Sequence, residues 1–66
     1  MKAFINGEER EFDSAPSILD LVRAEGLEGR RIAIELNGDI VPRSQHAETT
    51  IAEGDRVEIV HAIGGG

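Results

Sequence analysis

The sequence contains two Asn-Gly dipeptides, Asn6-Gly7 and Asn37-Gly38, and each lies between two short segments of alternating apolar and polar residues. A two-residue hairpin turn of type I′ needs a positive φ at both central positions, and Asn and Gly adopt this conformation most readily. The dipeptides therefore predict two β-hairpins. The predicted strands lie at residues 1–6 and 8–12 in the first hairpin, and at residues 32–36 and 39–41 in the second.

A single stretch between the hairpins carries the signals of a helix. Ser17 is a favourable N-cap, and Asp20 stands three residues later, where its side chain completes a capping box. Gly26 occupies the position at which a left-handed residue commonly follows the last helical turn. The pattern predicts a helix over residues 17–25. Its apolar stripe has the i, i+3, i+4 spacing of a core-facing surface and consists of Ile18, Leu21 and Val22.

The connection after the second hairpin is expected to be irregular. Pro42 has no N–H to donate to a ladder, so it ends the strand at 39–41. We expect residues 44–48 to form one helical turn capped by Ser44. Residues 49–51 are expected to be extended, with Ile51 in the core.

The last predicted strand covers residues 56–63. The alternation puts Val57 and Ile59 on one face. Glu58, Val60 and Ala62 then lie on the opposite face. An apolar residue on the outer face of a terminal strand is a candidate for a partner contact. We therefore take as the candidate partner face Val60, Ala62 and Ile63.

The predicted order of elements is ββαβ(β)β, which is an α+β design with one main helix against a mixed sheet of four to five strands. The first and last strands are the most hydrophobic, so we expect them in the sheet centre. A parallel pair there needs the long crossover that the helix provides. This is a β-grasp, or ubiquitin-like, fold. We expect the domain to cover residues 1–62, with a flexible C-terminal glycine tail at 63–66.

Composition narrows the classes of function. The chain has 66 residues, no cysteine, two histidines and a net charge of −6. The charge argues against nucleic-acid binding, which needs clustered Lys and Arg. No apolar run is long enough to span a membrane and no signal peptide is recognisable, so we expect a cytoplasmic protein. The histidines are too few for a metal site, and we expect His46 in a loop and His61 on a strand, neither of them catalytic.

The sequence ends in three glycines, Gly64, Gly65 and Gly66. Glycine has no side chain to pack and loses the most entropy on ordering, so this run does not serve stability. One reading is a thin arm that carries a reactive carboxyl group on Gly66 into a narrow channel. The other is a frayed end, since chain termini are often disordered. The tail alone favours neither reading.

The second half of the chain resembles the ThiS family, the sulfur carriers of thiamine biosynthesis. The segments that carry the resemblance are IAIELNGDIVPR at residues 32–43 and GDRVEIVHAIGGG at residues 54–66. The resemblance implies a co-substrate and not an enzyme, with Gly66 adenylated and then converted to a thiocarboxylate. It implies three partners: a ThiF-like adenylyltransferase that consumes ATP, a ThiG-like thiazole synthase, and a sulfur donor such as a cysteine-desulfurase relay. It implies no bound cofactor.

Three alternatives stay open at this stage. The small subunit of molybdopterin synthase uses the same tail chemistry. A ubiquitin-like modifier would be conjugated through Gly66 to lysines of other proteins. A plain binding module would carry an inert tail.

Overall fold

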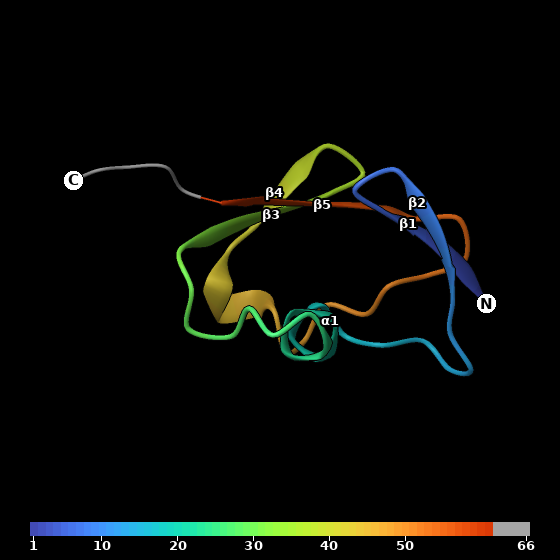
Figure 1. Cartoon of the computed structure of the whole chain (residues 1–66), viewed down its shortest axis with the longest axis horizontal. Helices are drawn as coiled ribbons and strands as arrows, with labels where there is room; N and C mark the ends of the chain where they lie inside the picture. Colours follow the sequence, from blue (N-terminus) through green and yellow to red (C-terminus); the bar gives the residue numbers. More distant parts are fainter. Residues whose placement is uncertain (62–66) are drawn as a thin grey trace.

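The computed structural model describes residues 1–61, which form one five-stranded mixed sheet with a single α-helix packed against one face (Figure 1). The strand order is β2-β1-β5-β3-β4, so β5 lies in the centre. It pairs parallel with β1 and antiparallel with β3. The elements are β1 (Lys2–Ile5), β2 (Glu8–Glu11), α1 (Ile18–Ala24), β3 (Ile32–Leu36), β4 (Asp39–Val41), a 3-10 helix (Arg43–Gln45) and β5 (Arg56–His61). This is the β-grasp arrangement that the sequence predicts.

Both hairpins turn at the predicted dipeptides. The φ angles are 51° and 83° at Asn6 and Gly7, and 52° and 90° at Asn37 and Gly38. Positive φ at both central positions is the requirement of a type I′ turn, so the prediction is confirmed. The returning strands β2 and β4 are the two edges of the sheet. Glutamates on β2 discourage pairing of this edge with another chain.

The helix begins and ends with the predicted caps. The Ser17 Oγ accepts from the Asp20 N–H at 3.0 Å, and the Asp20 carboxylate accepts from the Ser17 N–H at 3.1 Å. The bond from the Ser17 N–H to the carboxylate is the largest cause of the lowered pKa of Asp20, and the Ser17 side chain lowers it further. At the other end Gly26 has a φ of 73°, and the Leu27 N–H donates to the Val22 carbonyl at 2.9 Å. The pair closes the last turn in a Schellman motif.

The core lies between α1 and the sheet. Alternate residues of the strands point into it, as the buried and exposed positions along β5 show. Ile51, from the extended segment before β5, is fully buried there as predicted. The buried apolar side chains are Ala3, Ile5, Ile18, Leu21, Val22, Ile34, Val41, Ile51, Val57 and Ile59.

One detail differs from the sequence prediction. The turn after β4 is a 3-10 helix that starts directly after Pro42, and no side chain caps it. Ser44 therefore lies inside the turn, and the prediction that it is the cap was wrong. The reason is that Pro42, with φ of −60°, ends the strand and leads at once into helical geometry. His46 follows this turn in a loop, as predicted, and is buried with 6% exposure.

The end of the predicted last strand lies outside the described residues. β5 is described to His61, and the predicted strand continues to residue 63. Ala62, Ile63 and the expected boundary between the domain and a tail at 63–66 are not part of the described chain.

Asn6 offers a test of how the hairpins are joined to β5. Its backbone has positive φ, and its Oδ1 accepts from the Ile59 N–H at 2.7 Å. Asn6→Gly keeps the turn but leaves this partly buried N–H without a partner, so it should cost about 1–3 kcal/mol of unfolding free energy. Asn6→Ala loses the same bond and also strains the left-handed residue, which should add about 1–2 kcal/mol.

Urea unfolding of both variants beside the parent measures these costs. If Asn6→Gly were as stable as the parent, the side-chain bond to β5 would contribute nothing and only the turn conformation would matter.

Candidate functional site

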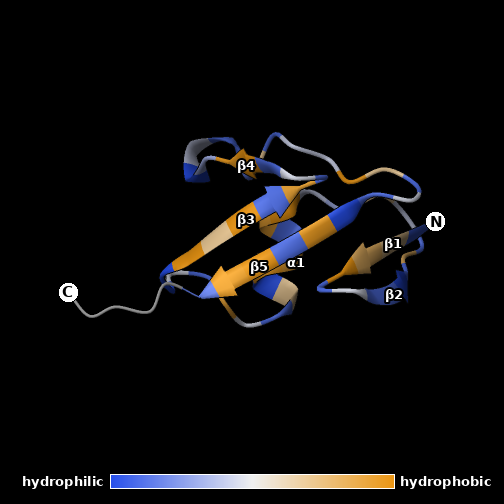
Figure 2. Ribbon diagram, turned by 90° about the horizontal axis from the view of Figure 1, so that it is seen from above, coloured by the Kyte–Doolittle hydropathy of each residue, from blue (hydrophilic) through white to orange (hydrophobic). Residues whose placement is uncertain are grey.

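The sheet face opposite α1 is open, and we call it the outer sheet face (Figure 2). The strand alternation that buries Val57 and Ile59 turns the intervening residues of β5 outward. The cross-strand register then brings outward residues of β3 and β4 beside them. The part of this face around β5 consists of Phe4, Ala33, Glu35, Ile40, Arg56, Glu58 and Val60.

Two large apolar side chains are exposed on this face. Val60 is 48% exposed and lies opposite Ala33 in the β3–β5 ladder. Ile40 is 62% exposed and lies opposite Glu35 in the β3–β4 ladder. Val60 was predicted as a partner-face residue, whereas Ile40 was missed. The exposure of Ile40 could have been predicted from the alternation along its three-residue strand, because its neighbour Val41 faces inward.

Two carboxylates stand side by side between these apolar residues. Glu35 and Glu58 are direct cross-strand partners. Like charges in this position destabilise a sheet, because their Cβ atoms are only about 4.5–5.5 Å apart. Neither forms an ion pair with any other residue of the described chain. The outer sheet face therefore combines exposed apolar side chains with two carboxylates that form no ion pair, and Arg56 lies on the same face.

The remaining predicted site residues follow the end of β5. Ala62, Ile63, Gly64, Gly65 and Gly66 all lie outside the described residues. His61 is the last described residue of β5, is exposed, and pairs with Ile32 of β3. The strand that precedes the glycine run is thus the central strand of the sheet, supported by ladders on both sides.

The two histidines lie in different surroundings. His46 is buried, and its Nε2 lies 3.0 Å from the Val41 carbonyl, whereas His61 is exposed at the end of β5. Within residues 1–61 no three His, Cys, Asp or Glu side chains are grouped so that they could hold a metal ion. In the same part of the chain no helix is long and apolar enough to cross a membrane.

The chain is similar to two thiazole synthases and to a sulfur carrier protein. The thiazole synthase of Paramagnetospirillum magneticum is 44% identical over 66 residues, covering all of this chain and 20% of that protein. The chain thus spans about a fifth of the length of this relative and of a second thiazole synthase, from Magnetococcus marinus. The sulfur carrier protein ThiS of Bacillus subtilis is 34% identical over 50 residues, or 76% of each chain.

A solved structure and a family model complete the comparison. The crystal structure of a thiamine biosynthesis protein (ThiS) from Geobacter metallireducens superimposes with a TM-score of 0.85 at 29% identity, covering both chains entirely. The model of the ThiS family matches residues 3–66. The chain therefore belongs to the ThiS family, and its fold is that of a ThiS protein.

Proposed function

We propose that the protein is a sulfur carrier of thiamine biosynthesis whose Gly66 carboxyl group takes up sulfur and donates it for thiazole formation. The observation that carries the proposal is the extent of the family match, which continues through the glycine run to residue 66. The likeness to the sulfur carrier of Bacillus subtilis supports the same function. In this role the protein is a co-substrate and the catalytic groups belong to its partners.

The chemistry of the tail follows from the properties of a carboxylate. A C-terminal carboxyl has a pKa of about 3.3–3.7, so at neutral pH it is an anion and a poor electrophile. Attack of this carboxylate on the α-phosphorus of ATP releases pyrophosphate and gives an acyl-adenylate. The terminal sulfur of a persulfide then attacks the acyl carbon, and AMP leaves. A thiol cleaves the resulting S–S bond, which frees the thiocarboxylate and leaves a disulfide.

Three partners are needed for this sequence of steps. A ThiF-like adenylyltransferase binds and consumes the ATP, and a persulfide relay that begins with a cysteine desulfurase supplies the sulfur. A ThiG-like thiazole synthase accepts it. The two thiazole synthases that contain a related segment support the last of these partners. We propose a cytoplasmic location, because the activating step consumes ATP.

We propose the outer sheet face as the docking surface for the adenylyltransferase. Val60 lies on β5, six residues before Gly66, and Ile40 extends the apolar area toward β4. Glu35 and Glu58 between them complement a basic group of a partner. We propose that Ala62 and Ile63 continue this contact from the face to the glycine run.

Val60→Asp tests the docking surface. A third carboxylate beside Glu58, in place of an apolar contact, should weaken binding to the adenylyltransferase at least tenfold, or by about 1.4 kcal/mol. The measurement is the rate of adenylation at limiting carrier concentration. Ala15→Asp is the matched control, since it adds the same charge at an exposed loop position. Equal adenylation of both folded variants would remove the outer sheet face from the interface.

The glycine run is tested by Gly65→Val and by one residue added after Gly66. A branched side chain at 65 blocks close approach of channel walls and excludes positive φ, so thiocarboxylate formation should fall at least a hundredfold. The added residue moves the carboxyl group off Gly66 and should abolish it. Unfolding free energies should change by less than about 0.5 kcal/mol, as for surface substitutions.

Intact mass spectrometry after incubation with the adenylyltransferase, ATP and a persulfide donor reports both results. A Gly65→Val protein that is converted as fast as the parent would contradict the narrow channel. Sulfur on the untrimmed extended chain would contradict the role of Gly66.

A further inference from the structure

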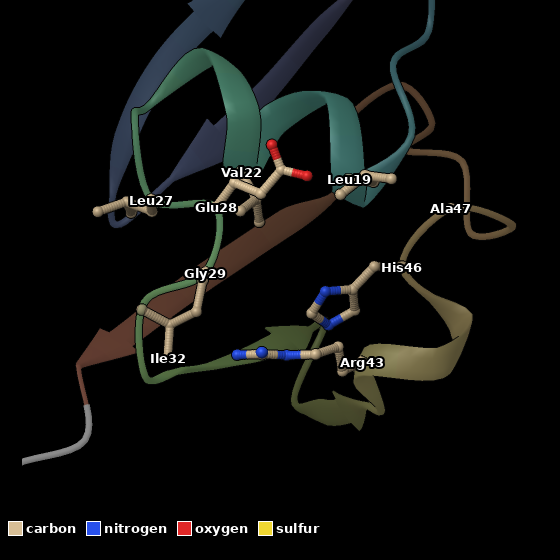
Figure 3. Close-up of a pocket in the computed structure, with 9 residues that line it drawn as sticks. All are labelled: Leu19, Val22, Leu27, Glu28, Gly29, Ile32, Arg43, His46 and Ala47. Atoms are coloured by element: carbon tan, nitrogen blue, oxygen red, sulfur yellow. The ribbon is translucent and has the colours of Figure 1, made fainter.

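A pocket of about 280 Å³ lies on the helix side of the molecule, away from the outer sheet face (Figure 3). It is enclosed by α1, by the loop from α1 to β3, and by the segment around the 3-10 helix. Its walls are mainly apolar and are formed by Leu19, Val22, Leu27 and Ile32. Gly29 lines it from the loop with backbone alone, and a Cβ there would meet nothing within 4 Å.

The polar groups at the edge of the pocket are already partnered. The Glu28 carboxylate pairs with Arg23 at 3.1 Å. The Arg43 guanidinium donates to the Arg30 carbonyl at 2.8 Å. The hydrogen bond of Arg43 goes to a neutral carbonyl, so its positive charge remains at the edge of the pocket. The walls themselves are mainly apolar, and they favour an occupant that is mainly apolar.

His46 gives the pocket one specific polar group. Its side chain projects into the space between the lining residues (Figure 3) and is 94% buried. The Val41 carbonyl can only accept, so Nε2, 3.0 Å away, carries the proton. In the neutral ring Nδ1 is then an acceptor, and it has no hydrogen-bond partner within residues 1–61. Since no fully buried side-chain nitrogen there lacks a partner, Nδ1 keeps some access to solvent.

We propose that this pocket receives one aromatic side chain with an N–H or O–H group, a tyrosine or a tryptophan, of the thiazole synthase. The inference rests on the proposed function. The volume lies just under the roughly 300–1,000 Å³ of small-molecule sites, which suits a single large side chain. Aromatic residues with a polar tip are the usual anchors of interfaces, and their donor is the group that His46 Nδ1 lacks.

The position of the pocket favours a partner that also takes the tail. Ile32, in the pocket wall, pairs with His61 in the β3–β5 ladder. The pocket therefore lies at the end of the domain from which residues 62–66 continue. A protein that binds both the tail and this wall gains affinity from two linked contacts. Since the outer sheet face is proposed for the adenylyltransferase, we assign this wall to the thiazole synthase.

The chemical preference of the pocket is tested with indole and 1-methylindole, in which a methyl group replaces the N–H hydrogen; the His46→Phe variant controls for the size of that methyl group. In titrations followed by amide chemical shifts, indole should perturb Gly29, Ile32 and Ala47 and bind at least fivefold more tightly than 1-methylindole. His46→Phe, which has no ring nitrogen, should bind the two probes equally. Equal affinity of both probes for the parent, or shifts confined to the outer sheet face, would overturn the proposal.

The partner is tested with Ala47→Leu, which enlarges an exposed residue that lines the pocket. The variant should lose indole binding and bind thiazole synthase at least tenfold more weakly than the parent. Ala52→Leu is the control, an exposed alanine outside the pocket. An Ala47→Leu protein that no longer binds indole but binds thiazole synthase like the parent would overturn the proposal. Thiocarboxylate formation on the parent is measured separately, so a failure of the proposed function is distinguished from a failure of the pocket.

Discussion

The structure depends on the central position of β5. This strand has a five-residue antiparallel ladder with β3 but only two parallel pairs with β1, Phe4–Arg56 and Ile5–Val57. β1 ends there because the chain turns at Asn6. Beyond the last backbone pair, the Asn6 side chain accepts a hydrogen bond from the Ile59 N–H of β5. Asn37 acts in the same way at the other turn, where its Oδ1 accepts from the Arg56 N–H at 2.9 Å. Two turn side chains thus complete the hydrogen bonding of the strand that precedes the glycine run.

The residues that stabilise the fold are largely different from those that we propose for partner recognition. The core is closed by aliphatic side chains between α1 and the sheet, and in residues 1–61 every side-chain nitrogen or oxygen that is fully shielded from solvent has a partner. The surfaces left over for recognition are the outer sheet face, with Ile40, Val60 and a pair of glutamates, and the pocket around His46. The outer sheet face lies on the side of the sheet away from the core, whereas the pocket borders the core and shares Val22 with it.

Local rules in the sequence predicted most of the architecture. The Asn-Gly turns, the Ser17–Asp20 capping box and the Gly26 terminus depend on a few adjacent residues, and all three were predicted correctly. The bonds from Asn6 and Asn37 to β5 were not foreseen, because they depend on which strands become neighbours.

The candidate site was less predictable for the same reason. Val60 was identified from the alternation along one strand, but Ile40 and the Glu35–Glu58 pair require the register between strands. The burial of His46 depends on a turn that starts at Pro42, one of several turns compatible with the local sequence. The role of residues 62–66 remains a prediction, which rests on the sequence and on the family match.

That the Gly66 carboxyl group carries sulfur is tested most directly on the protein recovered from cells that make thiamine. The measurement is intact mass spectrometry, with fragmentation of the C-terminal peptide. The proposed function predicts a chain that ends at Gly66, with a fraction of molecules carrying one sulfur atom in place of a carboxyl oxygen on that residue. Further residues after Gly66, or a terminal carboxyl that never carries sulfur while the adenylyltransferase is active, would contradict it.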